Sequence, residues 1–146
     1  MDRPASIVRF EQLYLAGFAV GVINTVISWS ASQERLAASI AMFGPAFLPI
    51  AMAIGFAITL LLWYFIARRG SAIAKWIATV FAAFAAIGLV IGLVRLLGGG
   101  GAFSVSAVLG YVASLLQIAA VTFLFRPDTR AWFGEPAAEG AADEAL

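Results

Sequence analysis

Four long runs without a charged residue constrain this chain more than any other feature of its sequence. The runs are residues 12–33, 36–67, 76–94 and 96–125. A helix must be about 20 residues long to cross a hydrocarbon core about 30 Å thick, because it rises about 1.5 Å per residue. Helices are also the default in lipid, since they satisfy their backbone hydrogen bonds within one segment. The sequence therefore predicts an all-α integral membrane four-helix bundle. Its expected spans are about 7–28, 46–67, 74–97 and 103–125.

The composition agrees with lipid as the solvent. Hydrophobic residues make up 63% of the chain and charged residues 12%, against about 45–50% and about 25% in soluble domains. A soluble domain of 146 residues could not hide so much apolar surface behind a charged exterior. The net charge of +1 provides no basic field for nucleic acid, so we expect no nucleic-acid partner.

The sequence contains neither cysteine nor histidine. Disulfides, thiol nucleophiles, thiolate metal sites and imidazole ligands are therefore excluded. We expect no two carboxylates to lie at one depth of the membrane, and no nucleophile has an evident base. The sequence predicts a protein that is not an enzyme, with no catalytic, metal or cofactor-binding residue.

Glycine and proline separate the runs. Gly44-Pro45 and Pro49 divide residues 36–67, which would otherwise form a helix about 48 Å long. The other separators are Gly70-Ser71, Gly98 to Gly101 and Pro127. The first run is longer than the apolar region of a signal peptide and carries Glu11 and Asn24, so we expect a retained span.

Two short segments outside the spans have helical character. Residues 32–43 favour a short interfacial helix on the periplasmic side, or else an extended start to the second span. Residues 128–133 favour a surface helix that Asp128 caps. We therefore expect a transmembrane domain over 1–133 and a flexible acidic tail over 134–146.

Basic residues predict the orientation of the chain. Seven lie in the N-terminal segment, the central loop and the C-terminal segment, and two lie on the other side of the spans. The seven are Arg3, Arg9, Arg68, Arg69, Lys75, Arg126 and Arg130, and the two are Arg35 and Arg95. This bias places both termini in the cytoplasm. The expected topology and headgroup anchors are Arg68, Arg69, Lys75, Arg126 and Arg130 with the interfacial Trp76 and Trp132. Specific lipid binding by the basic central loop is the alternative.

Small residues recur at four-residue spacing in the spans. Gly17 with Gly21, Gly88 with Gly92, and Gly110 predict close helix contacts, because lipid gives no hydrophobic drive between helices. Packing inside one bundle is the simpler interpretation. In the alternative, Gly17/Gly21 or Gly88/Gly92 faces another subunit.

Four polar residues would form the site if the protein were a transporter. They are Glu11, Asn24, Arg95 and Gln117. Glu11 and Arg95 lie near span ends, where Arg95 can extend toward the surface and Glu11 can pair with Arg68, Lys75 or Arg126. We expect no direct bond between Asn24 and Gln117. Gln117, Ser114 and Thr59 are the best candidates for an internal polar contact.

Three stretches carry a family resemblance. Residues 3–29, 60–76 and 125–133, "RPASIVRFEQLYLAGFAVGVINTVISW", "LLLWYFIARRGSAIAKW" and "FRPDTRAWF", together resemble small four-span inner-membrane proteins of proteobacteria, a family without a known activity. The resemblance implies a multi-pass protein of the bacterial inner membrane. We expect it to act by helix packing, as a homo-oligomer or an accessory subunit of a membrane complex. A small oligomeric transporter or channel is the alternative.

Overall fold

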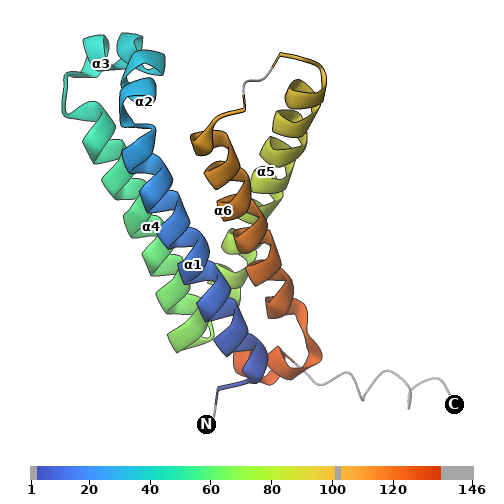
Figure 1. Ribbon diagram of the computed structural model, residues 1–146. Helices are drawn as coiled ribbons and strands as arrows, with labels where there is room; N and C mark the ends of the chain where they lie inside the picture. Colours follow the sequence, from blue (N-terminus) through green and yellow to red (C-terminus); the bar gives the residue numbers. More distant parts are fainter. Residues whose placement is uncertain (1–2, 101–102, 136–146) are drawn as a thin grey trace, which may run out of the picture.

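The computed structural model describes residues 3–100 and 103–135, and long helices dominate this part of the chain (Figure 1). The four long helices are α1 (Ala5–Ile27), α4 (Phe47–Arg69), α5 (Ala72–Leu97) and α6 (Val105–Thr122). Each is long and apolar enough to cross a membrane, α6 together with the 3-10 turn that follows it. The predictions of an all-helical structure and of four helices that could cross a membrane are confirmed for the described residues, and each predicted span end lies within three residues of a helix end.

The shorter elements lie between and after the long helices. Two short helices, α2 (Trp29–Arg35) and α3 (Ala37–Phe43), follow α1 where one short helix was expected. Three 3-10 turns follow α6, namely η1 (Phe123–Phe125), η2 (Pro127–Thr129) and η3 (Ala131–Phe133).

Local sequence explains where the helices begin and end. Ser71 and Ser104 cap α5 and α6, because their hydroxyls accept hydrogen bonds from Ala74 N and Ala107 N. Gly70 ends α4 with φ of 58°, a left-handed conformation that glycine adopts without steric cost. Pro49 is tolerated inside α4 because it lies in the first turn, where backbone N–H groups have no helical partner.

The helices α1 and α6 pack together between α4 and α5, and α4 and α5 diverge from each other toward one end (Figure 1). α1 packs against α4 and, most extensively, against α6, while α5 packs against α6 and α4. We call the end that holds the start of α1, the α4–α5 turn and η1–η3 the basal end. The distal end holds α2, α3 and the α5–α6 connection. Both ends of the described chain lie at the basal end.

Most of the buried core lies in the basal half. Phe10, Ile66 and Leu124 are fully buried there, and η3 contributes Phe133. Alanines supply the α5 side of this core, at positions 74, 78 and 82. Small side chains allow helices to approach closely, which is how contacts are gained in lipid.

Most apolar side chains on the long helices point outward. Only 11% to 17% of each hydrophobic window is buried. Phe84 is 66% exposed and Val90 58% exposed, both in the middle of α5. Water would strongly penalise so much continuous apolar surface, and lipid does not.

Candidate functional site

Asp128 closes the basal end by capping the first helix. Its Oδ2 accepts a hydrogen bond from Ser6 N at 3.1 Å, and its Oδ1 accepts one from the Ser6 hydroxyl at 2.8 Å. A carboxylate is favourable there because the first N–H groups of a helix lack partners and carry partial positive charge. The prediction that Asp128 caps a helix following it is therefore wrong, because its side chain is committed to α1, 122 residues away.

Residues 128–133 do not form the expected surface helix. They form the 3-10 turns η2 and η3, in which Thr129 and Phe133 are buried. The Thr129 hydroxyl donates to the carbonyls of Leu124 and Arg126, so its polar group is satisfied inside the protein. This segment is part of the basal core and packs at the basal ends of α1 and α6.

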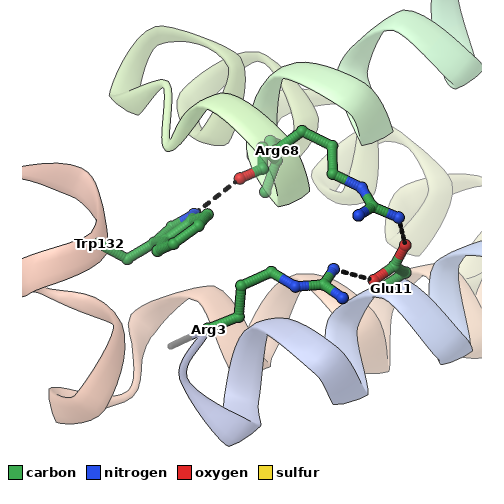
Figure 2. A network of polar contacts seen from close by, with 5 residues as sticks. Arg3, Glu11, Arg68 and Trp132 are labelled. Atoms are coloured by element: carbon green, nitrogen blue, oxygen red, sulfur yellow. Dashed lines mark hydrogen bonds and ion pairs between the residues drawn. The ribbon is translucent and has the colours of Figure 1, made fainter. Parts of the chain in front are cut away.

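Glu11 lies in an ion cluster at the basal end (Figure 2). Its carboxylate accepts hydrogen bonds from Arg3 Nη1 at 2.6 Å and from Arg68 Nη2 at 3.1 Å. Of the three partners expected for Glu11, the structure provides Arg68. The cluster ties the first turns of α1 to the end of α4, and it leaves Glu11 matched by two guanidinium groups.

Lys75 is buried, which corrects the expectation that it contacts lipid headgroups. It is 3% exposed, and its ammonium lies 2.6 Å from Glu135 Oε1. The same ammonium lies 4.7 Å and 4.8 Å from the ring centres of Phe125 and Phe133, within the range of cation–π attraction. Glu135 belongs to the predicted acidic tail, so Gly134 and Glu135 extend the folded domain. Residues 136–146 lie outside the described residues.

Trp132 has a role in tertiary structure beyond that of an interfacial anchor. Its indole N–H donates to the Ile66 carbonyl at 2.9 Å (Figure 2), which is one of the last four carbonyls of α4. Its own backbone carbonyl lies directly against Gly70, where a Cβ atom would collide with it. The α4–α5 turn and η3 therefore fit only if residue 70 is glycine.

The other predicted anchors remain accessible. Arg68, Arg69, Arg126 and Arg130 are exposed at the basal end, and Trp76 is 58% exposed. Arg126 lies over Phe123 and Arg68 over Trp63. A row of exposed guanidinium groups with an exposed indole is what contact with headgroups requires, and this role stays a prediction.

The five predicted packing glycines differ in what surrounds them. Gly17 packs tightly on α6, where a Cβ would lie 3.3 Å from Ala113 O, and a Cβ on Gly92 would meet the Tyr111 ring. A Cβ on Gly110 would lie 3.6 Å from Asn24 Nδ2, whereas Gly21 and Gly88 have nothing within 4 Å of a Cβ position. Each predicted pair therefore has one glycine inside the bundle and one beside open space.

Three of the four predicted transport residues lie apart from one another. Glu11 is in the basal cluster, and Arg95 is exposed near the distal end of α5. Asn24 is directed at α6, and its buried Oδ1 has no hydrogen-bond partner. Gln117 alone of the four lines an interior cavity.

That cavity is a half-open pocket between α1, α4 and α6, with a volume of about 210 Å³, and its lining runs along α1 from Tyr14 to Thr25. Tyr14, Thr25, Thr59 and Gln117 provide its polar groups. The remaining lining residues are Gly17, Phe18, Gly21, Phe56 and Ala113. Two of the three predicted internal polar residues, Gln117 and Thr59, thus meet in one place. The third, Ser114, donates to the Gly110 carbonyl in its own helix.

Sequence reasoning missed Tyr14 and Thr25 as cavity residues, although a periodic signal was present. Tyr14, Gly17, Gly21 and Thr25 follow one another at spacings of three, four and four residues, so they share one face of α1. The two glycines were interpreted as a packing motif alone. The polar residues that extend the motif in both directions mark the same face as a cavity wall.

The comparisons with known proteins give no relative. No family model matches the chain, and neither the curated proteins nor the solved structures include a similar one. Among residues 3–100 and 103–135, no three acidic side chains lie together as a metal site would need. The cavity and the basal cluster are therefore interpreted from their own geometry.

Proposed function

We propose that this chain is a multi-pass protein of the bacterial inner membrane that acts without chemistry of its own. It associates through its helix faces with further copies of itself or with other membrane subunits. The observation that carries the proposal is the outward position of glycines in the two outer helices. Gly55 in α4 and Gly88 in α5 are exposed, with open space where a side chain would be, and small residues of this kind let a neighbouring helix approach closely.

The orientation belongs to the same proposal. The basal end carries Arg68, Arg69, Arg126 and Arg130, and it faces the cytoplasm by the positive-inside rule. Both termini are then cytoplasmic, and α2 and α3 lie at the periplasmic surface.

The absence of cysteine from the sequence makes single-cysteine variants a direct test of orientation. Met42→Cys at the distal end reacts with a membrane-impermeant maleimide that is added to whole cells. In these cells the outer membrane has been permeabilised and the inner membrane is closed. Arg69→Cys reacts only after the inner membrane is opened. The reverse pattern would contradict the proposed orientation.

Association is tested by crosslinking and by mass. Gly88→Cys forms a disulfide with the same cysteine of a second copy, or with a cysteine introduced into another membrane subunit that co-purifies with the chain. Val90→Cys, an exposed control two residues away on another helix face, forms neither. Native mass measurement after gentle extraction reports the size of the same particle. A single chain with no crosslink from Gly88→Cys contradicts association.

Transport is the second candidate, and the interior cavity is the observation that favours it. Its polar groups come from three helices, and polar residues within the spans of membrane proteins mark substrate paths. Solute uptake by proteoliposomes that contain the protein, if Gln117→Leu abolishes it, would support transport. Equal uptake by liposomes without the protein would contradict transport.

A further inference from the structure

Charge defines the first property of a molecule that fits the interior cavity. The lining residues are tyrosine, threonine, glutamine, glycine, alanine and phenylalanine, none of which is charged at pH 7. The nearest acidic candidate by sequence, Glu11, is bound to two arginines in the basal cluster. A charged ligand would be desolvated here without a counter-ion, which is strongly unfavourable. The cavity therefore fits a neutral molecule.

Hydrogen-bond donors define the second property. The hydroxyls of Thr25 and Thr59 already donate to the carbonyls of Gly21 and Gly55, each at 2.9 Å. Tyr14 and Gln117 line the cavity from α1 and α6. The phenol and the primary amide together carry three donor hydrogens. The free donors suit a ligand with accepting oxygens, such as carbonyl groups.

Shape and size define the third property. Phe18 and Phe56 form an edge-to-face pair with ring centres 5.5 Å apart, and Gly17 and Gly21 leave a flat wall on α1. A volume of about 210 Å³ corresponds to about seven water molecules at roughly 30 Å³ each. That space accommodates one substituted six-membered ring and is too small for a phospholipid.

Depth defines the fourth property. Gln117 lies eight residues before Phe125, where the fourth apolar span ends, so it is about 12 Å from that end and well inside a hydrocarbon core about 30 Å thick. A ligand reaches this level by dissolving in the bilayer, and an apolar chain attached to it can remain among the lipids.

We infer that the cavity is a binding site for the neutral, carbonyl-bearing ring of a membrane-soluble quinone. The Tyr14–Gln117 pair donates to a ring carbonyl, Phe18 and Phe56 contact the ring, and the prenyl chain lies in the membrane. The inference concerns binding only, with no electron transfer. It stands apart from the proposed association with other subunits, since all the lining residues belong to one chain.

The test uses the full chain in lipid nanodiscs and a decyl-substituted dimethoxy-methyl-benzoquinone as the probe. Binding raises the thermal unfolding midpoint and saturates with probe concentration, whereas partition into lipid does not saturate. Empty nanodiscs give the partition background. Gln117→Leu, which keeps the side-chain volume and removes the donors, weakens binding about tenfold, the usual effect of losing one or two hydrogen bonds.

A second variant tests the inference if Gln117→Leu does not fold. Gly21→Leu fills the cavity, because nothing lies within 4 Å of its Cβ position, and it abolishes saturable binding. Ala19→Leu is the control, since Ala19 is exposed on the same helix, α1, and does not line the cavity. It changes the probe affinity by less than about twofold.

Two results overturn the inference. One is a midpoint shift that never saturates, or that is equal in the wild type and Gly21→Leu. The other is saturable binding of a neutral diacylglycerol probe with none of the benzoquinone. A monomeric particle that binds the probe would contradict the proposed association and leave this site in place, so the two proposals fail separately.

Discussion

The basal and distal halves of the bundle are held together by different means. At the basal end, side chains from five elements interlock. Asp128 caps α1, Trp132 bonds to α4, and Lys75 of α5 is enclosed by Phe133 and Glu135. At the distal end α4 and α5 diverge, and α2, α3 and the glycines after α5 are held by backbone hydrogen bonds within three to five residues.

The difference shows that one end of this helix bundle is fixed by contacts between distant residues, whereas the other end has few such contacts. Long-range polar contacts and a buried core fix the helix ends at the basal surface. Further along the helices, their outer faces remain apolar for lipid or for another helix. Substitutions in the two halves should therefore have unequal effects on stability, even where the residue type is the same.

Two phenylalanines give the largest expected contrast. Phe10→Ala removes a fully buried ring from the basal core and should lower the free energy of unfolding by about 3 to 5 kcal/mol. Phe84→Ala removes a ring that is 66% exposed and should cost less than about 0.5 kcal/mol, because lipid tails replace its contacts. Unfolding in mixed micelles of increasing SDS content measures both. Equal losses would show that the core is not concentrated at the basal end.

Two glycines with positive φ come next. Gly70→Ala places a Cβ against the Trp132 carbonyl, so η3 must shift and the Trp132–Ile66 bond is lost. We expect a loss of about 2 to 3 kcal/mol. Gly99 has φ of 75° but open surroundings, and Gly99→Ala should cost about 1 kcal/mol from backbone strain alone. The same SDS titration, followed by tryptophan fluorescence, compares them. A similar cost at both sites would remove the argument from the Trp132 contact.

Two helix caps give a smaller contrast. Asp128→Ala removes two hydrogen bonds to Ser6, one of them to the backbone N–H in the first turn of α1, with an expected loss of about 1 to 2 kcal/mol. Ser104→Ala removes one neutral cap from α6 and should cost about 1 kcal/mol or less. Hydrogen exchange at the first turn of each helix reports which cap has opened. Faster exchange in α1 is expected only for Asp128→Ala.

The smallest effect concerns the ion cluster. Glu11→Gln weakens contacts with Arg3 and Arg68, whose side chains are 34% and 46% exposed. Such pairs are screened by solvent, so the loss should stay below about 1 kcal/mol and shrink as salt is added. A loss much larger than this, or one independent of salt, would mean that the cluster is more isolated from water than its exposure indicates.

The helices were predictable because lipid imposes a simple rule on sequence. Charge-free runs mark the spans, and Gly44, Gly70 and Pro127 mark their ends, so the helix ends follow to within a turn. The pairing of Glu11 with Arg68 followed from their shared position near one surface.

The remaining features depend on contacts between distant residues, which a single sequence does not display. Lys75 counts as a basic loop residue in the sequence, and only the fold shows that η3 covers it. Asp128 precedes a suitable short segment, yet its partner is Ser6 at the other end of the chain. The cavity needs α1, α4 and α6 in their relative positions, which composition and spacing do not give.

The bond between Ser6 and Asp128 also sets an order for biosynthesis. The carboxylate that completes the start of α1 lies 122 residues further along the chain, so it is translated only after all four long helices. Until then, the backbone N–H and the hydroxyl of Ser6 lack the acceptor that Asp128 provides. The start of α1 is thus completed only when the segment after α6 has folded against it.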